Sequence, residues 1–304
     1  MNDMVLKLIE KSGYATEEDE AKITGLQQIV LNCLWLNVKE SCNLVSLMIQ
    51  YYKCDMDLDV CRKSLYVLTK VLETSRHKGV IEAAGVALGE SIQTLTSLPE
   101  CQLSSQPSLL LDQKLKEFIS EASNMASVTR RGAGLSIMVH RIVSNDMQTN
   151  KPLFHHFINT LLDCCKILQD DPRCLSNVHN KKDLPKAIYI HFLTRIVTDS
   201  SLTTEVMYYS EKLVELAFEN IISSHWQIRN AALQLYGALV PKLIGQKKDC
   251  GSEDEVTATV ACDEFRTHFP QLWIFILNQL KQDNEKENLQ FHSNLLPILN
   301  ILGF

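Results

Sequence analysis

The sequence has 304 residues, of which 45% are hydrophobic and 22% are charged, proportions that are typical of a folded globular chain and exclude a disordered one. Its 11 Gly and 8 Pro are too few for the frequent turns of an all-β protein, so we expect long helices joined by short connections. A net charge of −6 argues against a nucleic-acid binder that works through bulk charge, although it is compatible with a local basic patch.

The ten cysteines lie mostly within apolar stretches, and none of them forms a Cys-x-x-Cys pair. This pattern favours buried, reduced thiols in a cytoplasmic protein over disulfides or a zinc site. The first residues lack the continuous apolar core of a signal peptide, and no stretch approaches the roughly 18 apolar residues of a membrane span. We therefore expect a cytoplasmic chain without a transmembrane helix.

Helical periodicity dominates from about residue 21 onward, and we expect residues 1–20 to be a flexible N-terminal segment. The remainder, residues 21–304, is expected to be a single helical-repeat domain with loops at 98–110, 169–182 and 246–262. Expected helices lie near 24–52, 57–74, 77–97, 111–124, 126–144, 152–168, 183–198, 264–281 and 289–302.

Two segments on either side of Ser223 and Ser224 show the clearest pattern. In the first, one face collects Val206, Tyr209, Leu213, Leu216, Ala217 and Ile221; in the second, it collects Ile228, Ala231, Ala232, Leu235 and Leu239. Spacings of three and four residues predict helices, and the short connection predicts an antiparallel hairpin. Ser224 with Gln227, like Thr24 with Gln27, has the pattern of a capping box, and Gly245 is expected to end the second helix.

Weak internal similarity suggests repeats. Residues Arg131–Leu135 resemble Arg229–Leu233, and Glu82–Leu88 is a looser third copy with small side chains that let neighbouring helices approach closely. Together with the hairpin pattern, this similarity favours an all-α fold, a HEAT/armadillo-like α-solenoid of antiparallel helical hairpins.

Motifs for catalysis and cofactor binding are missing: the sequence contains no GxGxxG, GxxxxGK[ST], HExxH or GxSxG. His155 and His156 are adjacent, and adjacent helical positions point about 100° apart, so they make a poor metal chelate and are expected to be surface or packing residues. We expect no cofactor and no metal, and an enzymatic role is disfavoured.

Residues Ser127–Ser136 combine Arg130 and Arg131 with two glycines at the start of an expected helix. Each glycine inside a helix costs about 1 kcal/mol relative to alanine, which suggests that a neighbour, a backbone or a ligand passes close by. One interpretation is tight helix packing with an arginine in an ion pair. The other is an arginine pair that binds phosphate or a partner, since guanidinium groups suit both phosphate and carboxylate.

The segment around Trp226 leaves a similar choice. We expect Trp226, in the first helical turn, to anchor the hairpin in the core, while Arg229 and Asn230 are candidates to line a groove.

In this order, these segments resemble the central region of the THADA family. Thr129–Ser136 resembles the family motif T-R-R-S-A-G-L-P, with Gly132 and Ser136 departing from it, and His225–Ala232 is similar to W-x-[IV]-R-N-[AS]. Trp35–Ser41, with Lys39 and Glu40, looks like W-x-x-x-K-E-[IVS], and His77–Ala83 resembles H-[KR]-G-[AV]-x-E-A. Segments Lys151–Phe154 and Phe269–Leu272 also resemble family segments.

The resemblance implies a non-catalytic regulatory or scaffold subunit. Its partner would be an S-adenosylmethionine-dependent tRNA 2′-O-methyltransferase, which it would direct to tRNA position 32 in the anticodon loop. Family members are far longer, and the apolar end at 295–304 suggests a fragment or a short member. The residues expected to bind the partner or tRNA are Arg130, Arg131, Ala133, Gly134, Leu135, Arg229 and Asn230; Trp226, Trp35, Lys39 and Glu40 are expected to be structural motif residues.

A second hypothesis is a general protein–protein interaction scaffold with no RNA role, which the acidic net charge favours. Under the first hypothesis RNA contact must be local, through the basic residues Arg130, Arg131, Lys181, Lys182, Lys247 and Lys248.

Overall fold

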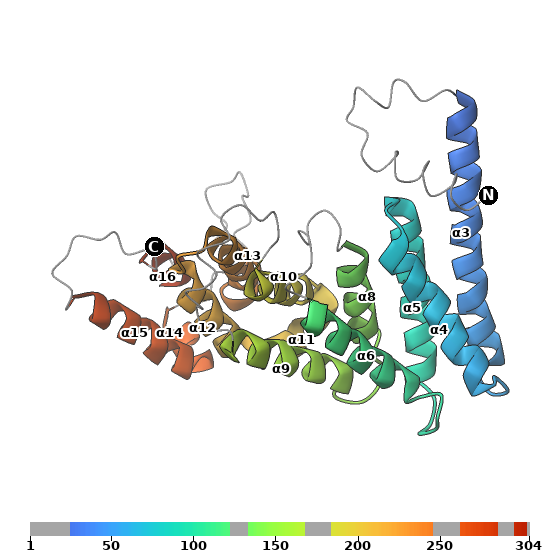
Figure 1. The fold of residues 1–304 in the computed structure, drawn as a ribbon. Helices are drawn as coiled ribbons and strands as arrows, with labels where there is room; N and C mark the ends of the chain where they lie inside the picture. Colours follow the sequence, from blue (N-terminus) through green and yellow to red (C-terminus); the bar gives the residue numbers. More distant parts are fainter. Residues whose placement is uncertain (1–24, 122–132, 168–183, 246–261, 285–294, 303–304) are drawn as a thin grey trace, which may run out of the picture. The chain divides into compact units, whose positions relative to one another are not determined.

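The computed structural model describes residues 25–121, 133–167, 184–245, 262–284 and 295–302 (Figure 1). Within these ranges every regular element is a helix and no residue lies in a strand, which confirms the all-α prediction. The chain forms two compact units, Met1–Asn159 and Thr160–Phe304.

Helix α5 lies at the centre of the first unit. It packs against α3, α4, α6 and α8. The helices of this unit are α3 (Gly25–Tyr52), α4 (Leu58–Thr74), α5 (Lys78–Thr96), α6 (Gln106–Glu121), α8 (Ala133–Ser144) and the first half of α9 (Pro152–Ile167).

Small residues let α8 approach α5 closely, as the sequence pattern predicted. A Cβ atom on Gly85 would lie 2.7 Å from the Ile137 side chain, and one on Gly89 would lie 2.8 Å from the Asn145 amide. Real Cβ atoms almost never approach so closely, so larger residues at these positions would push the two helices apart. The inner face of α5 is correspondingly buried from Val80 to Thr96.

Two side chains set where α4 and α5 begin. Asp57 accepts a hydrogen bond from the backbone N–H of Asp59 at 2.8 Å, the usual arrangement of an acidic N-cap. His77 caps α5 by accepting from the N–H of Val80 at 3.4 Å, and the Trp35 ring of α3 stacks on the His77 ring with centroids 5.3 Å apart. The Trp35 contact therefore joins α3 to the start of α5.

A buried carboxylate organises the turn from α8 to α9. Asp146 accepts hydrogen bonds from the backbone N–H groups of Gln148 and Leu153, both at 3.0 Å, so it satisfies an unpaired donor at the start of α9. The N–H of Met147 donates to Thr96 Oγ1 at 3.1 Å, which ties this turn to the end of α5.

In the second unit, α13 packs against both α10 and α12. The elements of this unit, after the second half of α9, are α10 (Pro185–Val197), a 3-10 turn η3 (Ser200–Leu202), α11 (Thr203–Met207), α12 (Ser210–Ile221), α13 (Trp226–Leu243), α14 (Cys262–His268), α15 (Pro270–Asn284) and α16 (Leu295–Leu302). Only residues 222–225 separate α12 from α13, which confirms the predicted hairpin.

The predicted apolar faces of this hairpin are buried along their whole length, including Val206, Leu213, Ala231 and Leu239. The Phe218 ring meets the rings of Tyr236 and Phe275 edge to face at 5.8 Å. Gly245 ends α13 with a positive φ of 81°, as its position predicted.

Several expected boundaries were wrong. α6 begins at Gln106 rather than near 111, so the first loop ends earlier than 110. Pro107 lies in the first turn of α6, where proline needs no hydrogen-bonded N–H. The expected helix 264–281 is divided at Pro270 into α14 and α15, because proline cannot continue the hydrogen-bond ladder of α14.

The segment ending at Ile221 is also two helices, because α11 ends at Met207 and α12 begins at Ser210. The Ser210 hydroxyl donates to the Met207 carbonyl at 2.8 Å, a local hydrogen bond that competes with a continuous helix. The expected loops at 169–182 and 246–262, apart from Cys262, lie outside the described residues, as do residues 1–20 and the expected capping residue Thr24.

Cysteine burial was predicted only in part. Among the described cysteines all are free thiols; Cys42, Cys61 and Cys165 are buried, whereas Cys33, Cys54 and Cys101 are exposed. In the same residues, no helix is long and apolar enough to span a membrane.

Candidate functional site

The arginine motif adjoins the start of α8. Arg130, Arg131 and Gly132 lie outside the described residues, and of Ala133 only the helical backbone is described. Gly134 and Leu135 lie in the first turn of α8, with Gly134 buried and Leu135 half-buried. Whether Arg130 and Arg131 bind a partner stays a prediction.

Gly134 touches the C-terminal turn of α4. A Cβ atom at Gly134 would overlap the Leu72 carbonyl oxygen and would lie 2.8 Å from the Leu72 carbonyl carbon. An α-hydrogen of glycine therefore occupies the space in front of that carbonyl, and no larger residue fits there without displacing a helix. The packing alternative thus explains Gly134, and it anchors α8 immediately after the arginine pair in the chain.

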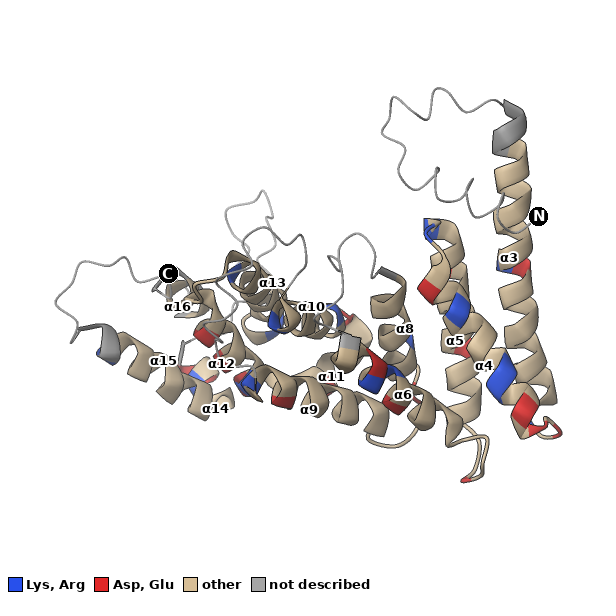
Figure 2. Cartoon of the chain, in the orientation of Figure 1, with Lys and Arg blue, Asp and Glu red and all other residues tan. Residues whose placement is uncertain are grey.

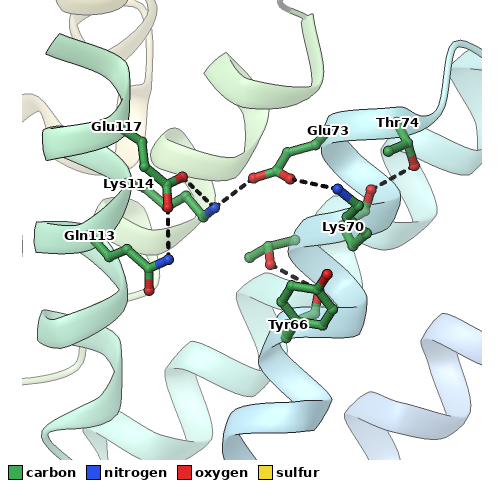
Figure 3. Close-up of polar contacts among 8 residues, drawn as sticks. Tyr66, Lys70, Glu73, Thr74, Gln113, Lys114 and Glu117 are labelled. Carbon is green, nitrogen blue, oxygen red and sulfur yellow. Dashed lines mark hydrogen bonds and ion pairs between the residues drawn. The ribbon is translucent and has the colours of Figure 1, made fainter. Parts of the chain in front are cut away.

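The neighbouring residue of α4, Glu73, joins the same turn to α6. Lys114 Nζ lies 2.6 Å from Glu73 Oε1 and 2.7 Å from Glu117 Oε2 (Figure 3). Gln113 Nε2 donates to the other Glu117 oxygen at 2.7 Å. Lys114 is nearly buried, and such a charge is tolerated only when it is paired, as it is here with two carboxylates.

The pKa values of this network reflect the pairing. Burial of the Lys114 ammonium lowers its pKa, but the hydrogen bonds to Glu117 and Glu73 raise it by more, so the pKa of Lys114 lies above its usual range. The hydrogen bond from Lys114 holds the pKa of Glu117 below its usual range. All three groups are therefore charged near neutral pH, and they hold α4 and α6 together.

Basic and acidic side chains are interspersed along the described helices (Figure 2). On α4, Lys63 Nζ lies 3.5 Å from Asp59, and Lys70 Nζ lies 4.0 Å from Glu73. Paired surface charges of this kind contribute little to stability, and they also reduce the positive potential available to an anionic partner.

The expectation that Trp226 anchors the core is wrong. Its side chain is 63% exposed, because it precedes Ile228 by two positions and therefore lies about 200° around α13 from that buried residue. The capping box at Ser224 is also wrong: His225 is the N-cap residue of α13 and no side chain caps the helix.

Arg229 takes a structural position in the hairpin. Its Nη1 donates to the carbonyl oxygens of Ser223 and Ser224 at 2.7 and 2.9 Å, which holds the connection between α12 and α13. Asn230 is exposed on the outer side of α13. A binding role for Arg229 and Asn230 stays a prediction.

The remaining motif residues lie on α3 and α9. Lys39 and Glu40 form an exposed pair at 3.7 Å, and Glu40 also accepts a hydrogen bond from Asn43. His156 Nε2 lies 2.7 Å from Asp112 Oδ1 of α6, in keeping with the predicted packing role. Among the described residues, no group of three or more His, Cys, Asp or Glu side chains is arranged to hold a metal ion.

The sequence showed part of this junction and missed the rest. Helical spacing places Lys114 and Glu117 three residues apart, which predicts a pair on one helix. Nothing in the sequence identifies Glu73 as the third member, or the Leu72 carbonyl as the neighbour of Gly134, because both contacts join residues that are far apart in the chain.

Comparison with known families assigns the whole chain. The family model described as "THADA/TRM732, DUF2428" matches residues 2–227, and the model described as "Trm732, C-terminal TPR repeats" matches residues 229–304. TPR repeats are antiparallel helical hairpins, so the second match confirms the predicted helical-repeat solenoid class. No solved structure matches the chain significantly.

Curated relatives carry one kind of name. The chain is 25% identical to the chicken "tRNA (32-2'-O)-methyltransferase regulator THADA" over 91% of its length, and 23% identical to the human protein of that name over 90%. It is 23% identical to the fission yeast "tRNA (32-2'-O)-methyltransferase regulator trm732" over 91%.

The relatives are much longer. The chain spans 15% of the chicken protein, 14% of the human protein and 18% of the fission yeast protein. The family model for residues 2–227 covers well over half of the sequence. The chain therefore belongs to the THADA/TRM732 family.

Proposed function

We propose that this chain acts as a non-catalytic regulatory segment for a cytoplasmic, S-adenosylmethionine-dependent tRNA 2′-O-methyltransferase. In this role it directs the enzyme to the ribose of nucleotide 32 in the anticodon loop. The observation that carries the proposal is the match of about nine-tenths of the chain to relatives named as regulators of this methylation.

The junction described above supports a role for the arginine pair. Gly134 packs α8 onto the C-terminal turn of α4, and Lys114 joins the same turn to α6. Arg130 and Arg131 directly precede α8, so their segment starts from a firmly packed helix. We propose that the pair contacts phosphate groups of tRNA or carboxylates of the enzyme, which both suit guanidinium groups. We also retain the proposal that residues 21–304 form one repeat array.

The experiment for the role is methyl transfer to tRNA by the purified cognate methyltransferase, with and without this chain. The proposal expects transfer to rise when the chain is added. Equal transfer in both reactions, from a chain shown to be folded by circular dichroism, would refute it.

The experiment for the site uses three variants in the same assay. Arg130→Ala with Arg131→Ala should abolish most of the stimulation, whereas Arg130→Lys with Arg131→Lys should retain part of it because charge remains but the planar fork is lost. Arg195→Ala removes an exposed arginine of α10 and is the matched control, with no expected effect. Unchanged stimulation by the double alanine variant would remove the site assignment.

A second candidate function is a protein–protein scaffold without an RNA role, which the exposed Trp226 favours. Exposed tryptophans are frequent anchors of protein interfaces. Gel shifts with tRNA at two salt concentrations, with and without the enzyme, separate the two functions. Only the regulator of tRNA methylation should give a shift that weakens as salt rises.

A further inference from the structure

A groove separates α4 from α6 in the first unit. Polar contacts bridge it at both ends: Arg62 Nε donates to Gln106 Oε1 at 3.1 Å, and Lys114 meets Glu73 at 2.6 Å. Between the bridges lies a cavity of about 380 Å³, lined by Arg62, Leu65, Tyr66, Thr69, Gln106, Leu109, Leu110, Gln113 and Lys114. This volume lies at the lower end of the range for small-ligand sites, roughly 300–1,000 Å³.

The walls of the groove present apolar surface to solvent. The Tyr66 side chain on α4 is 62% exposed and Leu109 on α6 is 51% exposed, while Leu65 beneath them is buried. Thr69 adds no unpaired donor to the floor, because its hydroxyl donates to the Tyr66 carbonyl at 3.0 Å. A flat aromatic ring above an apolar floor suits a planar ligand.

The charge at the groove is positive. None of the lining residues is acidic. The two carboxylates outside it, Glu73 and Glu117, are both engaged with Lys114, so the charge of Arg62 is the one left uncompensated by these contacts. One of the five guanidinium N–H donors of Arg62 is used by Gln106, and Arg62 lies one helical turn from Tyr66.

We propose that this groove receives one unpaired nucleotide of the tRNA, with its base stacked on Tyr66 and its phosphate on Arg62. The proposal rests on the proposed function and names an RNA contact separate from the arginine motif. Proteins recognise single-stranded RNA by stacking splayed bases on aromatic rings, and every base has a face that can stack. A base-paired nucleotide cannot enter, because its faces and pairing edge are occupied within the duplex.

The test measures the affinity of the full chain, alone and in complex with the methyltransferase, for a labelled short single-stranded RNA. Tyr66→Ala should weaken binding by about 5- to 150-fold, the loss expected for one stacked base, and Tyr66→Phe should bind as wild type does. Arg62→Ala should reduce the slope of log affinity against log salt by about 0.7, the value for one phosphate contact on a single strand.

Controls come from the same unit. Tyr51→Ala removes a tyrosine that is 81% exposed on α3, outside the groove, and Lys63→Ala removes the cation next to Arg62 in sequence. Neither change should have these effects. Because Tyr66 is exposed, Tyr66→Ala should melt as wild type does, and a melting scan checks this.

Several outcomes would overturn the proposal. They are absence of RNA binding by both the chain and its complex, equal affinity of the Tyr66→Ala and wild-type chains, and equal losses for a blunt RNA duplex and the single strand. If Tyr66→Ala weakened enzyme binding but not RNA binding, the groove would be a protein-docking site instead. A wild-type chain that stimulates methylation while Tyr66→Ala binds RNA normally would refute the groove and leave the proposed function intact; no stimulation by wild type refutes the latter.

Discussion

The same substitution at two glycines should change stability in opposite directions. Gly134→Ala adds a methyl group against the Leu72 carbonyl, whereas Gly237→Ala adds one where nothing lies within 4 Å. Both glycines lie within helices, so the gain in helix propensity is similar at the two sites. The difference between the two variants therefore reports the contact between α8 and α4.

The magnitude follows from the geometry. The new Cβ atom of Gly134→Ala would lie 2.8 Å from the Leu72 carbonyl carbon, whereas carbon atoms normally pack at about 3.5–4.0 Å. The start of α8 must therefore shift by close to 1 Å against backbone. Overpacking of this kind costs up to about 3 kcal/mol, offset by about 1 kcal/mol of helix propensity, so we expect a net loss of about 2 kcal/mol. Gly237→Ala should gain about 0.5–1 kcal/mol.

The assay is urea unfolding of the two variants and wild type, followed by circular dichroism. The unfolding midpoint should fall for Gly134→Ala and rise for Gly237→Ala. Hydrogen exchange measured on peptides of α4 and α8 then locates the effect, since only Gly134→Ala should speed exchange there. If Gly134→Ala raised the midpoint as Gly237→Ala does, the close approach of α8 to α4 would be refuted.

Three further predictions concern the network and the thiols. Lys114→Met should destabilise the fold by about 1–2 kcal/mol, because it strands two partly exposed carboxylates, whereas Lys63→Met in an exposed pair should cost under about 0.5 kcal/mol; urea midpoints of both variants test this. The pKa of Glu117 is lowered from 4.5, so its contribution is present above that pH and is lost as pH falls through the lowered pKa; the midpoint difference between wild type and Lys114→Met should shrink on acidification and stay constant if Glu117 is uninvolved. Hydrogen bonds to the Cys101 sulfur from Ser104 lower the pKa of that exposed thiol, and burial raises the pKa of Cys165 to about 12, so iodoacetamide should alkylate Cys101 much faster in the native protein; equal rates in peptide mass spectra would contradict this assignment.

Local signals predicted the helices where helix ends coincide with caps. The expected ranges 57–74 and 77–97 differ by one residue at most from the ends of α4 and α5, which Asp57 and His77 cap. The start of α6 was missed because Pro107 was taken as a breaker, although proline is compatible with a first helical turn.

The candidate site was predictable only where the cost was local. Two glycines in a helix indicate a close neighbour, and Gly134 has one. The identity of that neighbour was not predictable, since a backbone carbonyl such as that of Leu72 leaves no mark in the sequence. Trp226 shows the opposite failure: hydrophobicity suggested the core, but helical phase places its side chain on the exposed face of α13.

Position-resolved mapping of ribose methylation tests the central claim most directly. The cognate methyltransferase and an unmodified tRNA would be incubated with wild-type chain, with the Arg130→Ala and Arg131→Ala double variant, or with no chain, and each ribose would be scored by mass spectrometry of nuclease fragments. The account predicts that wild type raises methylation at nucleotide 32 and that the double variant does not. Methylation at nucleotide 32 that is the same in all three reactions would contradict it.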